Sequence, residues 1–381
     1  MDQRLIALCV GNAIIGTGTM LVPGMLPVLT AGLHVDLPAG GRLIAAFGLT
    51  VCVLTPVLAG WLSRIDRRLL LSALLLLFCA GHAVAALADS YAVVLATRVA
   101  CAISAGLFTS QAAGVTRLLV PPERQGAAVG FVFLGWSIAA VAGMPLGAWI
   151  GTTFGWRAGF ATVAALSLGA MIWVWFVLPG GLRVDRIDAR AWKALARNIP
   201  VLSVVAVTAL HSSAQFVVFS YYTPILVERT GAGPGGVPAM LGLFGLAGIV
   251  GNVVSIRTLD RFGVGTVATA TIALMAAGQV LMLAGGYGWP GMIAGSILWG
   301  LGCFASNSAQ QARLLGFAPA LAPVSIALNS SAIYFGQAVG AEGGGRIISA
   351  AGFDPLPWAS LPVFCVALAV SVAVERARGR R

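Results

Sequence analysis

The chain has 381 residues, of which 59% are hydrophobic and only 9% are charged, and its mean hydropathy is +0.95. This composition excludes an ordinary water-soluble globule, because such domains carry about 25% charged residues. The formal net charge of +11 does not indicate a nucleic-acid partner, since the basic residues lie in short clusters between apolar segments. The apolar segments reach the ~20 residues that a spanning helix needs, so we expect an all-α polytopic membrane protein in a lipid bilayer.

Apolar runs broken by charges, prolines and glycines predict twelve spanning helices. Six belong to an N-terminal bundle, residues 1–178, and six to a C-terminal bundle with a short basic tail, residues 200–381. The charged stretch 179–199 between them is expected to be a cytoplasmic linker. The predicted spans are 5–30, 42–63, 69–88, 91–118, 127–151, 158–178, 200–226, 237–256, 265–285, 289–314, 324–350 and 357–375.

Basic residues predict the orientation, because Lys and Arg of short loops are retained on the cytoplasmic side. In a twelve-span arrangement Arg4, the pair Arg67 and Arg68, most linker charges and the tail "ERARGRR" fall on one side. Both termini are therefore predicted to be cytoplasmic. The six cysteines lie in apolar segments without metal-ligand spacing, so we expect neither a metal nor a cofactor.

Two predicted spans carry glycine at every fourth position, and the pattern recurs in the two halves. The three glycines of span five and the three of span eleven differ by the same offset of 193 residues. The dipeptide Asp66-Arg67 after span two likewise recurs as Asp260-Arg261 after span eight, at an offset of 194. The halves are therefore predicted to be parallel repeats of six helices. The two ladders are Gly143, Gly147 and Gly151, and Gly336, Gly340 and Gly344.

Small residues let helix backbones approach closely in a membrane, so the ladders predict helix contacts. Glycines of span eight, among them Gly248 and Gly251, form a further strip that we expect to receive a partner from the other half. The alternative for all of these glycines is that they merely permit tight static packing.

Span five, "GWSIAAVAGMPLGAWIGTTFGWRAGF", resembles the antiporter motif of one branch of the major facilitator superfamily, with Gly143, Pro145 and Gly147 in place. That branch comprises bacterial drug:proton antiporters, including sugar, nucleoside and chloramphenicol exporters. The stretch "ALNSSAIYFGQAVGAEGGG" is similar to the corresponding eleventh helix. The resemblance implies two six-helix bundles, a small-molecule substrate, protons as the co-substrate of export, and a monomer. The short loops and small tail are typical of a bacterial protein, so we expect a bacterial inner membrane.

The loops "GWLSRIDRR" and "IRTLDRFG" are altered versions of the superfamily's loop signature. In the family this loop clamps the cytoplasmic side through charge pairs, which implies a gating role for Asp66, Arg67, Asp260 and Arg261. The alternative is that these arginines only set the topology.

An ionisable side chain at membrane depth costs several kcal/mol, so each one is a functional candidate. Arg98 matches the arginine of the superfamily's fourth-helix motif, which implies a role in proton coupling; alternatively it snorkels to the outer interface. Glu342 and Arg346 lie one turn apart and can pair, so Glu342 is either a proton site or half of a static ion pair. His211 either relays protons or makes an interhelical hydrogen bond.

The first helix contains "GTGTMLVPG" and no carboxylate, whereas relatives in this branch commonly carry an acid there. Proton coupling would therefore have to rest on Arg98, Glu342 or His211, or on a carboxylate such as Asp36 at the outer mouth.

Uncharged polar side chains in the spans of both halves predict one central cavity suited to neutral or weakly polar molecules. For each of them the alternative is an interhelical hydrogen bond. The candidates for the cavity lining are Asn12, Gln111, His211, Gln215, Tyr222, Asn307, Gln310 and Asn329.

These features predict a secondary active transporter that exports small organic molecules by proton antiport, with alternating access of the two bundles. One alternative is an uncoupled or importing facilitator for a sugar or nucleoside, and another is a membrane receptor or scaffold without transport. An enzyme is not expected, because the sequence has no nucleotide-binding glycine loop, His-rich metal set or convincing catalytic triad.

Overall fold

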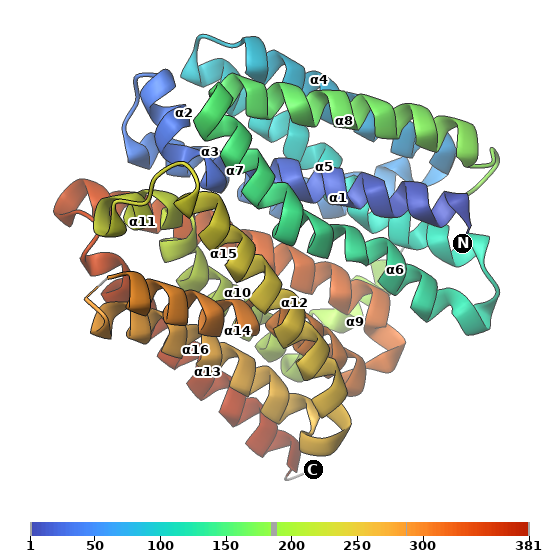
Figure 1. Cartoon of the computed structure of the whole chain (residues 1–381). Coiled ribbons are helices and arrows are strands. Elements are labelled where there is room, and N and C mark those ends of the chain that lie inside the picture. Colours follow the sequence, from blue (N-terminus) through green and yellow to red (C-terminus); the bar gives the residue numbers. More distant parts are fainter. Residues whose placement is uncertain (1, 184–188, 287, 380–381) are drawn as a thin grey trace. The chain divides into compact units, whose positions relative to one another are not determined.

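The computed structural model describes residues 2–183, 189–286 and 288–379, and within these ranges it contains helices and no strand (Figure 1). The chain forms two compact units, Met1–Arg186 and Ile187–Arg381. The division falls in the stretch proposed as a linker, of which residues 184–188 lie outside the described residues.

The N-terminal unit consists of eight α-helices and three short helical turns in its described part. The aspartates Asp2, Asp36 and Asp66 each cap a helix by accepting a hydrogen bond from a backbone N–H of its first turn. The elements are α1 Gln3–Gly24, α2 Leu26–Gly32, α3 Leu37–Trp61, η1 Leu62–Arg64, α4 Arg67–Leu87, α5 Tyr91–Leu119, η2 Pro122–Arg124, α6 Gln125–Ile138, η3 Ala139–Gly143, α7 Met144–Phe154 and α8 Trp156–Val177.

The C-terminal unit begins with a short helix from the linker, followed by helices that match the predicted spans seven to twelve. Its described elements are α9 Ala189–Leu195, α10 Ile199–Phe219, α11 Tyr222–Thr230, α12 Gly236–Phe262, α13 Val264–Ala284, α14 Trp289–Phe317, η4 Pro319–Leu321, α15 Ala322–Ala351 and α16 Pro355–Gly379.

The first predicted span of each half is broken near its C-terminal end and forms two helices. The breaks lie at Met25, between α1 and α2, and at Ser220, between α10 and α11. Each precedes a proline, Pro27 or Pro224, and these two prolines are separated by 197 residues. Proline cannot donate to the carbonyl four residues earlier and clashes with it, which ends the first helix before the second begins. The repeat of the two halves thus extends to a shared helix break.

Predicted span five is also irregular. Between α6 and α7 the chain forms one turn of π-helix, Ala139–Gly143, directly before Pro145. Pro145 has no N–H for the carbonyl of Val141, and a wider turn at this point accommodates the missing bond and the ring. The resemblance motif "GMPLG" therefore begins in a π-turn rather than in a regular helix.

The number of crossings differs from the predicted twelve when it is judged by length and hydropathy alone. Ten helices qualify among the described residues, and α14 with α15 qualify only together, as a pair bent by 119°, which gives at most eleven. These two helices have 29 and 30 residues, and at 1.5 Å per residue each is long enough for a ~30 Å hydrocarbon core. Their lower hydropathy reflects the amides and charges that they carry, and the twelve-span arrangement stays a prediction.

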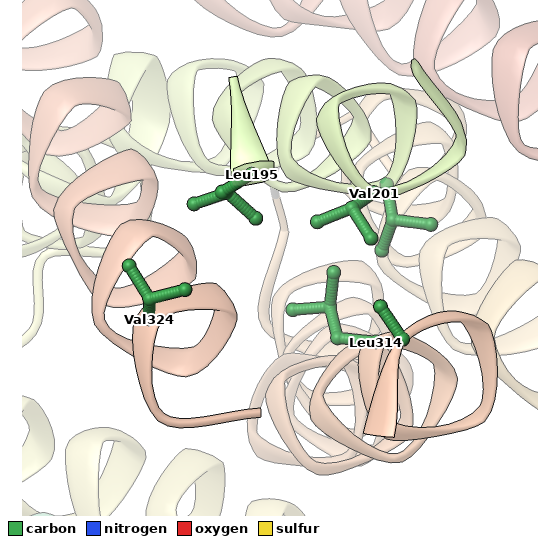
Figure 2. Close-up of a cluster of buried hydrophobic side chains, with 6 residues drawn as sticks. Leu195, Val201, Leu314 and Val324 are labelled. Carbon is green, nitrogen blue, oxygen red and sulfur yellow. The ribbon is translucent and has the colours of Figure 1, made fainter. Parts of the chain in front are cut away.

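The linker helix α9 packs its apolar face on one end of the C-terminal unit. Leu195 is buried in a cluster with Val201 of α10, Leu314 of α14 and Val324 of α15 (Figure 2). The side chains of Val201 and Leu314 point toward each other across the cluster. Val201 and Val324 lie near the N-terminal ends of α10 and α15, and Leu314 lies near the C-terminal end of α14, so the cluster joins these three helix ends.

Candidate substrate and proton sites

The glycine ladder of span five packs on the first helix of the same unit. A Cβ atom on Gly143 would lie 1.9 Å from Oγ1 of Thr17, and one on Gly151 would lie 3.0 Å from Cβ of Met25. Gly147, between them, faces the same helix. Real Cβ contacts are not as short as 1.9 Å and are rarely as short as 3.0 Å, so the glycines favour this approach of η3 and α7 to α1.

The second ladder packs on α10 in the same manner. A Cβ atom on Gly340 would lie 2.4 Å from the carbonyl oxygen of Ser213, and one on Gly344 would lie 2.8 Å from the ring of Tyr221. Gly336 faces Ser212 and its neighbours on the same helix. In each half, the last glycine of the ladder thus lies against the break in the first helix, at Met25 or at Tyr221. The ladders fasten the fifth helix of each unit to its first.

The glycine strip of span eight has a different partner from the one expected. A Cβ atom on Gly248 would lie 2.0 Å from the ring of Phe304, and one on Gly251 would lie 1.9 Å from the carbonyl oxygen of Leu301. Both partners belong to α14 of the same unit, so the expectation of a partner from the other half was wrong for these two glycines. A close approach of α12 to α14 within the unit uses the space that the missing side chains leave.

Arg98 is buried inside the N-terminal unit, with 1% of its surface exposed. Its guanidinium donates to the carbonyl oxygens of Gly18 at 3.1 Å and Thr19 at 3.4 Å, and lies 4.4 Å from the ring centroid of Phe47. The alternative of an arginine that snorkels to the outer interface is therefore wrong. The cation is held by backbone dipoles and an aromatic face instead of a carboxylate.

Pro23 explains why one carbonyl oxygen of α1, that of Thr19, is available to this arginine. Pro23 lies inside α1 and has no N–H to donate to the carbonyl of Thr19, four residues earlier. A freed carbonyl in a membrane helix needs a replacement donor, because no water reaches it there. Arg98 supplies that donor, so the proline and the arginine form one structural unit.

His82 of α4 lies on the other side of Gly18 and was not among the predicted residues. It is 1% exposed, its Nδ1 lies 2.9 Å from the carbonyl oxygen of Phe78 and 3.3 Å from Sγ of Cys101. A Cβ atom on Gly18 would lie 2.8 Å from Nε2 of His82. The principle that singled out Arg98, that an ionisable group at membrane depth is a functional candidate, would have found His82 as well.

Asn12 connects three helices of the N-terminal unit. Its amide donates to the carbonyl oxygen of Val132 at 3.2 Å and accepts from the hydroxyl of Thr109 at 3.0 Å. These bonds join spans one, four and five, as the interhelical alternative for Asn12 requires. Gln111 is also buried, at 8% exposure, and lies on the same helix as Thr109.

A polar layer in the C-terminal unit joins the equivalent spans seven, ten and eleven. Oγ1 of Thr208 donates to Oδ1 of Asn329 at 2.7 Å, and Nδ2 of Asn329 lies 3.5 Å from Oδ1 of Asn307. Nε2 of Gln311 donates to the same oxygen of Asn307 at 3.2 Å. Two of the predicted cavity residues, Asn307 and Asn329, thus form one uncharged network with Thr208 and Gln311.

Two further predicted residues connect the seventh and tenth spans. Nε2 of Gln215 donates to Sγ of Cys303 at 3.0 Å, and the hydroxyl of Tyr222 shares a hydrogen bond of 2.5 Å with that of Ser296. Both Gln215 and Tyr222 are buried. The structure therefore places them in the contact between α10–α11 and α14.

His211 and Gln310 differ from these neighbours because their polar atoms have no hydrogen-bond partner. His211 is 3% exposed and Gln310 is 0% exposed. Both ring nitrogens of His211 and both amide atoms of Gln310 are buried without a partner. Such groups are costly, at about 1–3 kcal/mol each, and call for an explanation.

Glu342 and Arg346 form the ion pair that their spacing permits. Nε of Arg346 lies 3.0 Å from Oε1 of Glu342, and the side chains are 79% and 35% exposed respectively. A half-exposed pair near the end of α15 fits the static alternative.

The first loop motif holds the chain that leaves span six. Asp66 caps α4 through the N–H of Leu69 and also accepts from the N–H of Gly181, while the N–H of Arg67 donates to the carbonyl oxygen of Leu182 at 3.0 Å. The Arg67 side chain is buried. The motif therefore acts within the N-terminal unit, where it fixes the start of the linker.

The second loop motif is arranged differently. Asp260 and Arg261 are both exposed, and the guanidinium of Arg261 lies 5.2 Å from the ring of the adjacent Phe262. The buried charge pair of this unit is instead Arg313, 0% exposed, with Glu375 at 2.7 Å. Sequence reasoning missed this pair, although a glutamate in the last turn of an apolar span was a usable signal.

Repeated helical units with buried polar layers at membrane depth define a polytopic membrane transporter. Among the described residues no group of three or more His, Cys, Asp or Glu side chains is arranged to hold a metal ion. The family model described as Major Facilitator Superfamily matches residues 8–341, and the chain belongs to this family of transporters.

Relatives and solved structures agree with this assignment. The chain is 32% identical over 353 residues to the inner membrane transport protein YdhP of Escherichia coli strain K12, covering 92% of this chain and 90% of the relative. It is 29% identical over 327 residues to a probable sugar efflux transporter of Mannheimia succiniciproducens, covering 85% and 79%. The crystal structure of a variant of the peptide transporter POT in complex with sulfate has a TM-score of 0.80 at 13% identity, covering 98% and 95%. That last likeness supports the fold.

Proposed function

We propose that this protein exports small organic molecules across the membrane in exchange for protons. The outward direction of transport is supported by the similarity of this chain to a probable sugar efflux transporter, which covers 85% of the chain. The family supplies the class of activity, and the resemblance of span five to the antiporter motif supports the exchange with protons.

The mechanism that fits is alternating access, in which two bundles open a central site to either side in turn. Such a mechanism needs units that keep their internal packing while they move. The glycine ladders support this, because they bring the fifth helix of each unit close to its first helix. In the C-terminal unit the nearest atoms include main-chain atoms of α10, and in the N-terminal unit they are side-chain atoms of Thr17, Leu21 and Met25. Such close contacts leave little freedom to adjust, which favours each unit moving as one body.

Arg98 is the residue that we propose for proton coupling in the N-terminal unit, with His82 beside it. A proton or substrate that changes the charge near Gly18 would alter how strongly Arg98 holds the carbonyl of Thr19, which Pro23 frees. The helix break near Met25 lies within one turn of Pro23, so this end of α1 is where such a change would act.

Transport assays with the purified protein in liposomes test the proposal. Chloramphenicol, arabinose, uridine and tetraphenylphosphonium serve as substrates, with and without an imposed pH gradient. We expect the gradient to accelerate the movement of at least one compound, and Arg98→Gln to abolish that acceleration. Arg346→Gln, at an exposed arginine, is the control that should retain it. The proposal fails if no compound responds to the gradient.

An uncoupled facilitator is the second candidate, because the described part of the N-terminal unit has no carboxylate at membrane depth. The same assay separates the two candidates, since a facilitator moves substrate at equal rates with and without the gradient. Every described carboxylate of the unit lies at a helix end or in a loop: Asp2, Asp36, Asp66, Asp89 and Glu123.

We further propose a monomer in a bacterial inner membrane with both termini in the cytoplasm. In this orientation the outer side keeps few arginines, and two of them are neutralised. Arg157 pairs with Asp89 at 2.6 Å, and Arg229 pairs with Asp354. Neutralised outer charges leave the unpaired basic excess on the cytoplasmic side, as the positive-inside rule requires.

A further inference from the structure

The contacts between α10 and α14 follow one constant register. The two helices run antiparallel, so lower residue numbers in α10 lie opposite higher residue numbers in α14. The two residue numbers of three contacting pairs add to the same total, as expected for antiparallel helices, and the ring pair Tyr222–Trp299 is offset by three residues. The three pairs are Tyr222 of α11 with Ser296, Phe219 with Trp299, and Gln215 with Cys303. Toward the start of α10, Val201 and Val204 share a buried cluster with Leu314.

This register places His211 and Gln310 in the middle of the contact. His211 lies four residues before Gln215 and thus opposite Asn307, whereas Gln310 lies opposite Thr208. His211 and Gln310 therefore lie on facing surfaces about one helical turn apart. Neighbouring contacts bound them on both sides, namely the Gln215–Cys303 hydrogen bond on one side and the cluster of Val201, Val204 and Leu314 on the other.

Thr208 and Asn307, the residues opposite Gln310 and His211 in this register, already have hydrogen-bond partners. His211 and Gln310 do not. Thr208 and Asn307 both bond to Asn329 of α15. Both nitrogens of His211 and both amide atoms of Gln310 are buried without a partner. Together they offer donors and acceptors from two facing helices.

We propose that His211 and Gln310 form the subsite that binds an uncharged hydrogen-bonding group of the transported molecule, such as a hydroxyl or an amide. The assignment rests on the proposed function and specifies its substrate class. A histidine and a glutamine can each donate and accept, so a group with both capacities satisfies the two side chains at once.

The surroundings explain why the bound group is uncharged. No Asp, Glu, Lys or Arg occurs in α10, and the guanidinium of Arg313 on α14 is committed to Glu375 and Ser371. A cation or an anion would thus enter a buried layer without a counter-charge, which is strongly unfavourable. Neutral polar molecules avoid this cost.

The test uses the full chain in liposomes and compares neutral with charged probes. Chloramphenicol, arabinose and uridine are the neutral probes, and tetraphenylphosphonium and salicylate are the charged ones. Each is measured for wild type, His211→Leu, Gln310→Leu and Gln279→Leu. Gln279 is the matched control because it is equally buried in the same unit but bonds to Ser360 of α16.

We expect His211→Leu and Gln310→Leu each to raise the KM of a transported neutral probe about five- to fifty-fold, which corresponds to one lost bond with its partner left unsatisfied. Gln279→Leu should change this KM less than twofold. The inference is overturned if wild type moves a neutral probe and neither variant alters its KM, or if only charged probes are transported. Absence of all transport by wild type would instead contradict the proposed function.

Should a leucine variant fail to reach the membrane, Gln310→Glu supplies the same information with a nearly isosteric side chain. A carboxylate at this position introduces the missing counter-charge, so transport should shift from neutral probes toward tetraphenylphosphonium. Unchanged preference between the two probes would overturn the inference.

Discussion

Replacing Gly340 by alanine tests whether the ladders hold each unit together. The added Cβ would lie 2.4 Å from the carbonyl oxygen of Ser213 and 2.8 Å from Cβ of Phe216. The nearest atom belongs to the main chain of α10, which cannot rotate away as a flexible side chain would. The helices must therefore separate, and overpacking of this kind costs about 1–3 kcal/mol.

Gly343, three residues further along the same helix, provides the control. A Cβ atom there would meet no other atom within 4 Å. Both substitutions gain the same helix propensity of about 1 kcal/mol, so the difference between Gly340→Ala and Gly343→Ala isolates the contact with α10. For a unit of this size, about 1–3 kcal/mol corresponds to about 2–12 °C in Tm.

Thermal unfolding of the two purified variants in the same detergent, followed by tryptophan fluorescence, measures this difference. We expect Gly340→Ala to unfold at the lower temperature. Equal Tm values, or a higher Tm for Gly340→Ala, would show that α15 does not depend on the glycine to approach α10, and the account of the ladders would be wrong.

Three other predictions follow from the buried charges and the topology. Arg98→Met should lower the free energy of unfolding by about 1–3 kcal/mol, because it removes the donor to the freed carbonyl of Thr19. In a Pro23→Ala background this loss should be smaller. An equal loss in both backgrounds, measured by denaturant titration, would refute the coupling between Arg98 and Pro23. Glu375→Gln should cost about 3–5 kcal/mol, since it leaves Arg313 buried without its counter-ion, whereas Glu342→Gln at the half-exposed pair should cost less than about 1 kcal/mol; similar losses would contradict this ranking. Fluorescent-protein fusions to either terminus should both be fluorescent, because we propose that both termini lie in the cytoplasm. A non-fluorescent fusion at one terminus would indicate an odd number of crossings.

Hydropathy and glycine spacing were sufficient to predict the helical class and the repeat, because both are properties of the local sequence. The offset between the two ladders correctly indicated equivalent helices. It did not identify their partners: the strip with Gly248 and Gly251 packs on α14 of its own unit. A small residue indicates that another helix packs closely against it. Which helix that is depends on the packing of the whole unit.

The candidate sites show the same limit. Single polar residues such as Asn329 and Asn307 were recognisable in apolar spans, whereas their mutual bonds depend on rotamers and on the register of three helices. His82 was detectable from the sequence, because it is an ionisable residue inside a predicted span. The link between Arg98 and Pro23 was not, because two residues 75 positions apart in the chain meet only once α1 and α5 are packed.

The two units use equivalent helices for different chemistry. In both, polar side chains join the first, fourth and fifth helices: Asn12 in the N-terminal unit, and Thr208 with Asn329 in the C-terminal unit. Within the described residues, the N-terminal unit adds a buried cation, Arg98, whose hydrogen-bond partners are carbonyl oxygens, whereas the C-terminal unit holds neutral buried groups without partners, His211 and Gln310. A charge at one level and a neutral layer at the other cannot serve the same ligand equally well. We therefore propose that the first unit provides charge-dependent coupling and that the second recognises an uncharged molecule.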